Sequence, residues 1–295
     1  MGKRPVNPIS ISVAPLNRLT SRMYYDLANT IKIMRRLLDA SVAVGFEIQN
    51  LAEWDARTPP CDEGERRLAA WEASEKHTVA QLAATLTESG LPVLSIHANR
   101  DVGMCLCSGQ PEDIARGRQL IHESLWLAEQ VRAGVCVFHL WDTWKETFDP
   151  AILQNAIREI AAQFPTVKAA IENVPTHLTG HTPFDLAQAY DWITLDLRWA
   201  ALFDQFHAFA ALKDRIANVH LSGQLVNAQW TVNTKWFANP QHIIEFDAAL
   251  DILIGQWGFD GPLTVEICSA HEATWDDLVA AMNTLVKRDE LSDRQ

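Results

Sequence analysis

Four apolar segments in the second half of the chain end in a residue with a titratable side chain. These residues are Glu172, Asp196, His220 and Glu266. A single carboxylate in such a place is usually a hydrogen-bonded core residue or a surface group. Four consecutive segments that all end in a titratable residue are harder to explain by these structural roles. If the segments are neighbouring parallel strands of a barrel, their carboxyl ends meet at one mouth and the four side chains become neighbours.

Three carboxylates at one mouth would repel one another and raise each other's pKa unless a cation lies among them. One divalent ion, bound by carboxylate oxygens and an imidazole nitrogen, removes this conflict. Mn²⁺ suits these ligands best, and Zn²⁺, Co²⁺ or Mg²⁺ is possible. Two vicinal oxygens of a substrate could chelate such an ion while the flanking carboxylates move a proton between adjacent carbon atoms. The pattern therefore predicts a metal site with proton-transfer chemistry.

The elements that would position these residues follow from an alternation of short apolar segments and longer segments with helical spacing. Strands are expected at 9–13, 42–48, 92–97, 135–139, 167–172, 192–196, 216–220 and 263–266. Helices are expected at 21–40, 63–89, 111–132, 150–163, 183–189, 200–213, 247–255 and 273–287. The strands read as largely apolar on both faces, which is typical of buried parallel strands.

The alternation predicts an α/β fold, a single (β/α)8 TIM barrel over residues 1–295 with a polar, frayed tail at 288–295. An open, doubly wound sheet would alternate in the same way. Against it, no Gly-rich phosphate loop follows the first strand, where the residues are Ala14-Pro15-Leu16-Asn17-Arg18. No linker or shift in composition divides the chain.

Charge and composition exclude several classes of protein. The net charge of −12 disfavours a nucleic-acid partner, because a protein that follows phosphates needs a basic surface. No apolar stretch is long enough to span a bilayer, and no secretory signal is visible, so a cytoplasmic protein without membrane contact is expected. The five cysteines are odd in number and irregularly spaced, which favours reduced, structural thiols.

Several short segments resemble the xylose isomerase-like TIM-barrel superfamily. They are Ile171-Glu172-Asn173, Ile193-Thr194-Leu195-Asp196-Leu197, Val219-His220-Leu221-Ser222, Phe246-Asp247 and Gly258-Phe259-Asp260-Gly261-Pro262-Leu263-Thr264-Val265-Glu266-Ile267. The superfamily contains sugar isomerases and epimerases, dehydratases and abasic-site endonucleases. The resemblance implies that Glu172, Asp196, His220 and Glu266 are metal ligands, and that Glu172 and Glu266 are also the catalytic acid/base pair acting through an enediolate.

Some positions differ from the family pattern, and these differences reduce the number of family branches to which the chain could belong. Trp199 stands where the nuclease branch and many epimerases have a histidine, and residues 224–240 lack the Asp-x-His pair of the nucleases. A three-metal cluster therefore lacks ligands. Val226 stands where the ketose epimerases have an arginine, which argues against a plain ketohexose epimerase.

Further residues are expected near a substrate. His97 and His139 end the third and fourth strands and face the same mouth; they are candidates for substrate hydrogen bonding, although satisfied strand-end histidines remain an alternative. Glu47 matches a second-strand carboxylate often seen near the substrate, with a structural role as the alternative. Arg198 could bind an anionic substrate group or a neighbouring acid, and Trp199 could offer an aromatic face to a sugar.

The leading hypothesis is a metal-dependent isomerase or epimerase of a small sugar, polyol or hydroxy-carbonyl compound. A dehydratase that uses the same site is the runner-up, and a non-catalytic or partner-dependent barrel is the third possibility. The long connection 221–240 has no clear periodicity and could be a lid over the site, which the sequence leaves open. A homo-oligomer is possible.

Overall fold

The strands close into a parallel barrel. The computed structural model describes residues 7–13, 26–40, 45–61, 65–226, 229–231 and 246–267, and the single positions 275, 279, 282 and 285. Within these residues, eight parallel strands form the barrel: β1 (Ile9–Ser12), β2 (Gly45–Gln49), β3 (Val93–His97), β4 (Val135–Phe138), β5 (Lys168–Glu172), β6 (Trp192–Asp196), β7 (Ile216–Val226) and β9 (Leu263–Ile267). Each strand pairs with the next along the chain, and β9 returns to β1. The expected (β/α)8 barrel is confirmed.

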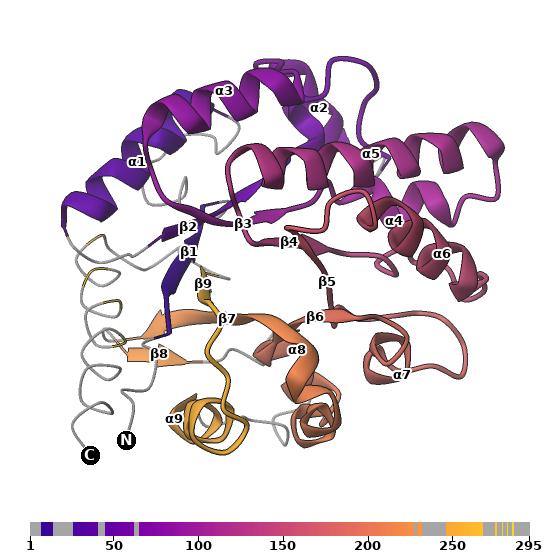
Figure 1. Cartoon of the computed structure of the whole chain (residues 1–295). Helices are drawn as coiled ribbons and strands as arrows, with labels where there is room; N and C mark the ends of the chain where they lie inside the picture. The colour runs from indigo at the N-terminus through magenta and orange to yellow at the C-terminus, as the bar shows by residue number, and fades with distance from the viewer. Residues whose placement is uncertain are drawn as a thin grey trace.

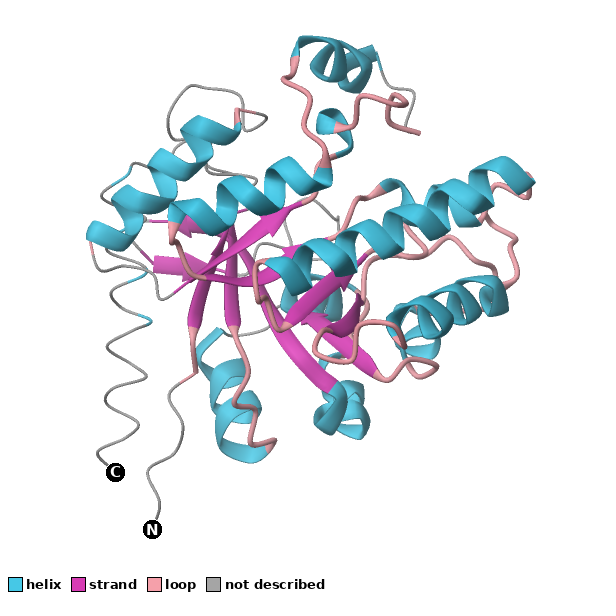
Figure 2. Ribbon diagram, turned by 45° about the horizontal axis from the view of Figure 1, so that its top comes forward, coloured by secondary structure: helices cyan, strands magenta, loops and turns pink. Residues whose placement is uncertain are grey.

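Helices surround the strands, as Figures 1 and 2 show. The α-helices of the described residues are α1 (Leu27–Asp39), α2 (Glu65–Ala73), α3 (Val79–Ser89), α4 (Asp101–Leu106), α5 (Pro111–Gln130), α6 (Pro150–Ala161), α7 (Pro183–Ala187), α8 (Leu197–Leu202) and α9 (Phe246–Leu250). Two 3₁₀ helices, η2 (Ala52–Trp54) and η3 (Phe206–Arg215), and a π-helical turn, η4 (Asp251–Gln256), complete the set. None of these helices has the length and apolar character that crossing a bilayer requires.

The observed helices differ from the expected ones in three places. The helix expected at 63–89 is two helices, because Thr78 and Gln81 form a capping box that starts α3 anew. The helix expected at 200–213 begins earlier, at Leu197, and continues as the 3₁₀ helix η3 after Asp204, whose φ is 54°. The short helix α4 was not expected. The helix expected at 273–287 and the tail at 288–295 lie outside the described residues, apart from the single positions.

The connection expected at 221–240 contains strand structure. β7 continues to Val226 and pairs in antiparallel fashion with β8 (Gln229–Thr231). The first part of this connection is therefore a hairpin and not an irregular loop. Residues 232–240 lie outside the described residues, so the lid stays a hypothesis.

The two faces of the barrel strands differ in polarity, contrary to the expectation of strands that are apolar on both faces. Apolar residues such as Phe46, Ile96 and Val219 pack in the main hydrophobic core together with helix residues. On β2, β3, β7 and β9 the alternate residues include polar ones that bond across strands: Ser95 Oγ donates to Glu47 Oε2 at 2.8 Å, and Thr264 Oγ1 donates to Asn218 Oδ1 at 2.9 Å. These polar groups tolerate burial because they are hydrogen-bonded. A small second apolar cluster contains Val135, Val137, Ala170 and Ala217.

We expect Gly103→Ala to destabilise the fold. A Cβ atom at Gly103 would lie 2.4 Å from the carbonyl oxygen of Leu140, which belongs to the backbone after β4 and cannot move freely. Alanine is the better helix former, but the overlap should dominate and lower the free energy of unfolding by about 1–3 kcal/mol. Urea denaturation measures this change.

Gly134→Ala is the matched control, because nothing lies within 4 Å of a Cβ atom there. Equal stability of the two variants would contradict the close packing of α4 against the connection after β4.

Candidate metal centre

The four strand-end residues of the second half of the barrel lie together at its carboxyl end. Glu172 and Asp196 are the last residues of β5 and β6. Asp196 stands opposite His220 in the β6–β7 register, and Glu266 stands opposite Ser222 in the β7–β9 register. Barrel closure thus converts residues that are far apart in the sequence into neighbours, as the strand pattern predicts.

His220 is at the centre of this group. Its Nδ1 atom lies 3.3 Å from Glu172 Oε2 and 3.9 Å from Glu266 Oε2. Ligand atoms of Glu172, Asp196 and His220 all lie within 4.8 Å of one another, and all three residues are buried. The Glu266 side chain is 28% exposed, so the group opens to solvent on that side.

A serine that the sequence analysis gave no role joins two of the carboxylates. Ser222 Oγ contacts Asp196 Oδ2 and lies 2.7 Å from Glu266 Oε2. A hydroxyl has one hydrogen and can donate to only one of these oxygens. The other contact therefore needs a proton on one of the two carboxyl groups. Ser222 follows His220 by two residues on the same strand. Side chains at this spacing point to the same face of a strand, so the sequence could have placed Ser222 on the inner face.

Glu47 contacts the other ring nitrogen of His220, Nε2. It is fully buried in β2, and its Oε2 atom lies 3.1 Å from His220 Nε2. The same oxygen accepts a hydrogen bond from Ser95 and lies 3.4 Å from Asn218 Nδ2. With Nε2–H bonded to this carboxylate, loss of the second ring proton would leave a lone pair on Nδ1, directed towards Glu172 and Glu266. The sequence analysis names Glu47 as a candidate substrate contact. In the structure, Glu47 lies beside the candidate ligand His220.

The charges of the group are balanced by protons. Burial, together with the charges of Glu172 and Glu266, raises the pKa of Asp196 to about 7. Burial opposes ionisation of Glu172 as well, but the imidazoles of His139 and His220 hold the pKa of that carboxyl well below its usual range. Burial disfavours a charged His220, yet Glu47 and Glu172 raise its pKa well above the usual value. A divalent cation would take the place of these protons.

The donor set fits such a cation. It offers three carboxylates and one imidazole nitrogen, a mixture that suits Mn²⁺ or Zn²⁺. His220 Nδ1 is buried and has no hydrogen-bond partner of good geometry, although two carboxylates face it. A lone-pair nitrogen held by a carboxylate on its other side is the usual arrangement of a metal-ligating histidine.

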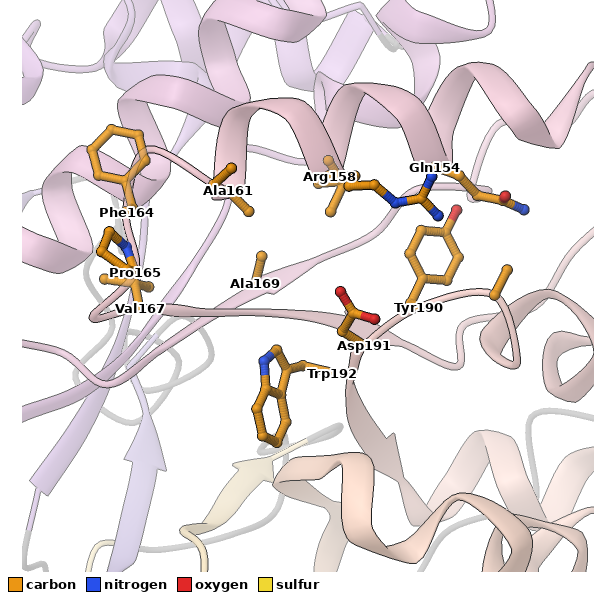
Figure 3. A pocket seen from close by; sticks show the side chains of 13 residues that line it. Gln154, Arg158, Ala161, Phe164, Pro165, Val167, Ala169, Tyr190, Asp191 and Trp192 are labelled. Carbon is orange, nitrogen blue, oxygen red and sulfur yellow. The ribbon is translucent and has the colours of Figure 1, made fainter.

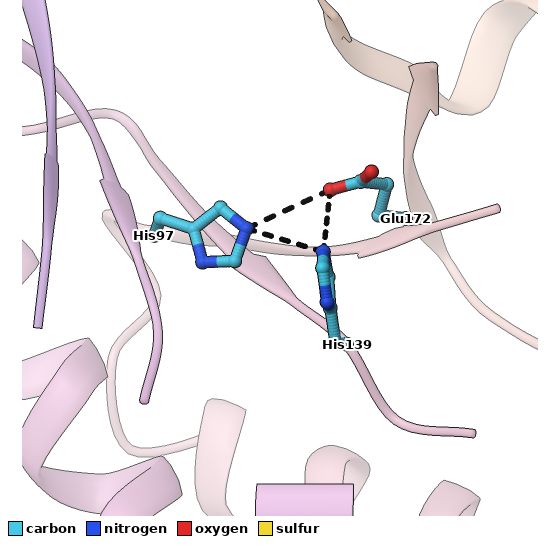
Figure 4. Close-up of side chains that lie close together, drawn as sticks. All are labelled: His97, His139 and Glu172. Carbon is cyan, nitrogen blue, oxygen red and sulfur yellow. Dashed lines mark hydrogen bonds and ion pairs between the residues drawn. The ribbon is translucent and has the colours of Figure 1, made fainter. Parts of the chain in front are cut away.

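A second donor group shares Glu172 (Figure 4). His97 Nε2 lies 3.2 Å from His139 Nε2, and His139 Nε2 lies 3.0 Å from Glu172 Oε2. The other ring nitrogens have their own neighbours: His97 Nδ1 lies 3.1 Å from the carbonyl oxygen of Ala98, and His139 Nδ1 lies 3.6 Å from Asp142 Oδ2. The two histidines therefore border the first group, at the mouth where the sequence analysis expects them.

The family model for the xylose isomerase-like TIM barrel matches residues 48–285. The chain belongs to this family. A comparison with curated proteins gives no match.

Solved structures of several sugar epimerases are similar in fold to this chain. The D-allulose 3-epimerase from Methylomonas sp., in complex with D-allulose, is 14% identical, with a TM-score of 0.63 over 98% of this chain and 99% of that chain. A 3-keto-D-glucoside 4-epimerase from E. coli is 14% identical, with a TM-score of 0.62 over 95% and 99%. An L-ribulose 3-epimerase is 15% identical, with a TM-score of 0.60 over 98% and 96%. At these identities the likeness is one of fold.

Arg198 and Trp199 follow Asp196 in the first turn of α8. Asp196 Oδ1 caps this helix by accepting a hydrogen bond from the Trp199 backbone N–H at 2.9 Å. The Arg198 guanidinium carbon lies 4.5 Å from the centre of the Trp199 ring, and both side chains are partly exposed. They are held next to a candidate ligand, and contact with a substrate stays a prediction.

An ion pair that the sequence analysis missed supports His139. Arg100 Nη2 lies 3.0 Å from Asp142 Oδ2, and Asp142 in turn faces His139. Burial would lower the pKa of His139, but the charges of Glu172 and Asp142 raise it to about 9. Asp142 lies in the connection after β4, where no periodicity marks its orientation.

A separate cavity lies away from these side chains. A cavity of about 250 Å³ is lined by α6 residues, by the start of β5 and by Tyr190, Asp191 and Trp192 before and at the start of β6 (Figure 3). It lies at the amino ends of these strands, whereas Glu172 and Asp196 are at their carboxyl ends. The cavity is therefore separate from the candidate metal centre.

Metal binding is expected to depend steeply on pH. Because the ion must displace protons, including the proton of Asp196 with its pKa of about 7, affinity rises with pH and falls about tenfold or more from pH 7 to pH 6. Calorimetric titration of Mn²⁺ and Zn²⁺ in buffers with different ionisation enthalpies measures both the affinity and the protons released. The same affinity at pH 6 and pH 8, without proton release, would contradict the assignment.

Glu47→Gln tests the support of His220. The amide keeps the shape of the side chain but removes the charge, so we expect the affinity for Mn²⁺ to fall about 10–100-fold. Ser95→Ala is the control, because it removes only one of the donors to Glu47 and should have a smaller effect. If a folded Glu47→Gln variant binds metal as the unchanged protein does, Glu47 does not support the imidazole.

Proposed function

We propose that the chain is a divalent-metal-dependent epimerase or isomerase of a small sugar, polyol or hydroxy-carbonyl compound. One observation carries the proposal: two carboxylates from different strands, Glu172 of β5 and Glu266 of β9, converge on the same nitrogen of His220, at 3.3 and 3.9 Å. The pair thus flanks the proposed metal position, so both carboxylates would lie close to a substrate held by that ion.

The proposed metal ligands are Glu172, Asp196, His220 and Glu266, with Mn²⁺ as the favoured ion. When bound, the ion would hold a carbonyl oxygen and the vicinal hydroxyl oxygen of the substrate, and it would make the hydrogen on the hydroxyl-bearing carbon more acidic. The remaining chemistry belongs to side chains. One of Glu172 and Glu266 removes the proton and the other returns it, to the opposite face in an epimerisation or to the neighbouring carbon in an isomerisation.

The surroundings of the pair suit this chemistry. Burial keeps water away from Glu172, while the partly exposed Glu266 leaves a route for the substrate. His97 and His139 border the position from β3 and from the connection after β4, where they could hydrogen-bond substrate hydroxyl groups. Arg198 and Trp199 are proposed as further substrate contacts from α8.

The solved relatives indicate which substrates to try first. These relatives are a D-allulose 3-epimerase, a 3-keto-D-glucoside 4-epimerase and an L-ribulose 3-epimerase. Each name refers to a sugar with a carbonyl group, and a carbonyl acidifies the hydrogen on the adjacent carbon. A ketose or a keto sugar is therefore the proposed substrate class.

Hydrogen exchange tests the proposed function. The Mn²⁺-loaded protein is incubated in D₂O with D-allulose, L-ribulose and a 3-keto-glucoside, and deuterium next to the carbonyl is followed by NMR. We expect incorporation into at least one of them, and a loss of at least about 100-fold in Glu172→Gln and Glu266→Gln, because each removes one acid/base group.

The exposed acid Glu159, which is ion-paired with Arg118, provides the control variant Glu159→Gln, and its activity should be unchanged. An absorbance increase from an unsaturated ketone, in place of exchange into recovered sugar, would assign the site to a dehydratase. A protein that binds no metal and exchanges no hydrogen would be a non-catalytic barrel, and the proposal would be wrong.

A further inference from the structure

Two cysteines outside the candidate metal centre lie in direct contact. Cys61 follows η2 in the connection after β2, and Cys105 belongs to α4, which follows β3. Their sulfur atoms are 3.2 Å apart, and both thiols are free. Since a disulfide bond is about 2.05 Å long, bond formation needs a closing movement of only about 1 Å.

A guanidinium group lies against this pair. Arg116 Nη1 of α5 is 3.3 Å from Cys61 Sγ, and Arg116 Nη2 is 3.4 Å from Asp101 Oδ2. Asp101 also accepts a hydrogen bond from the Cys61 backbone N–H at 2.9 Å. A positive charge beside a partly exposed sulfur stabilises the thiolate, which is the nucleophilic form.

The other described cysteines lack these features. Burial raises the pKa of the Cys136 thiol, inside β4, well above its usual value. Burial also raises the pKa of the Cys107 thiol to about 12. Cys107 and Cys136 fit the structural thiols that the sequence predicts.

In the contacting pair, the hydrogen bond to Cys105 and burial raise the pKa of the Cys61 thiol. The hydrogen bond from Cys61 and the charge of Arg116 lower the pKa of Cys105, against the effect of burial. The contact between the two sulfurs thus favours a thiolate within the pair.

We propose that Cys61 and Cys105 form a redox-active dithiol that closes to a reversible disulfide, with Arg116 as the group that activates the pair. The oxidant is a peroxide. The thiolate of the pair attacks one peroxide oxygen and the O–O bond breaks. That cysteine becomes a sulfenic acid, and the other oxygen takes up the proton that the thiol had released and leaves as water. The sulfur of the second cysteine then attacks the sulfenic sulfur, the S–O bond breaks, its thiol proton goes to the departing oxygen, and the disulfide and a second water form.

The two cysteines differ in their freedom to move. Cys105 is buried, and its helix is confined on two sides: a Cβ atom at Gly103 would overlap the Leu140 backbone, and one at Gly117 of α5 would lie 3.1 Å from the Cβ of Cys105. Cys61 is partly exposed and lies in a connection. We therefore expect the segment that contains Cys61 to move when the disulfide forms, and the disulfide would link this segment covalently to α4.

Peptide mapping after oxidation tests the proposal. The full chain, kept metal-free with a chelator, is treated with a small excess of hydrogen peroxide, alkylated and digested without reduction. We expect a peptide that links Cys61 to Cys105, the loss of two of the five thiols, and full recovery with dithiothreitol. Separate sulfinic acids without a link, or a link no more abundant than in the denatured chain, would overturn the proposal.

Two sets of matched variants distinguish oxidation of Cys61 and Cys105 from general oxidation of cysteines. Cys61→Ser should abolish the link, whereas Cys107→Ser should retain it. Arg116→Gln should slow oxidation about tenfold, because it removes the charge that favours the thiolate. Arg118→Gln, two residues further along α5 and paired with Glu159 away from the sulfurs, should not. Equal rates in the two arginine variants would refute the activating role of Arg116.

Discussion

Negative charge buried around His220 is the constraint on which the rest of the site depends. Glu47, Glu172 and Asp196 are all withdrawn from water, and burial without a partner would make their ionised forms very costly. In the structure the compensation comes from hydrogen bonds and from protons on the imidazoles and on Asp196. In the proposed function a metal ion replaces such protons, and a substrate with vicinal oxygens reaches it from the side of the partly exposed Glu266.

Rigid strands of the barrel hold these buried charged side chains in place. The candidate ligands come from adjacent strands β5, β6, β7 and β9, so backbone hydrogen bonds fix their spacing. Beneath them, the inner faces of β2, β3, β7 and β9 carry a hydrogen-bonded layer of Glu47, Ser95, Asn218 and Thr264. This layer sets the orientation of the His220 ring. The polar interior that makes the strands less apolar than the sequence indicates is thus the support of the site.

Much of this arrangement follows from the sequence alone, since parallel strands that end in Glu172, Asp196, His220 and Glu266 must deliver those side chains to one mouth. The alternation of strand faces could also have indicated Ser222, which has the same orientation as His220. Other features carry no such signal. Asp142 lies in a connection without periodicity, and the approach of Cys61 to Cys105 depends on how α4 packs between α5 and the connection after β4. The break before α3 did have a signal, the Thr78–Gln81 capping box.

Anomalous diffraction from crystals grown with Mn²⁺, measured on both sides of the absorption edge, tests the central claim most directly. The account predicts one strong peak within about 2.0–2.4 Å of oxygen atoms of Glu172, Asp196 and Glu266 and of the Nδ1 atom of His220. A peak held by His97, His139 and Glu172 alone would contradict it. So would the absence of any ion at saturating metal, with the imidazole of His220 still protonated between its carboxylates.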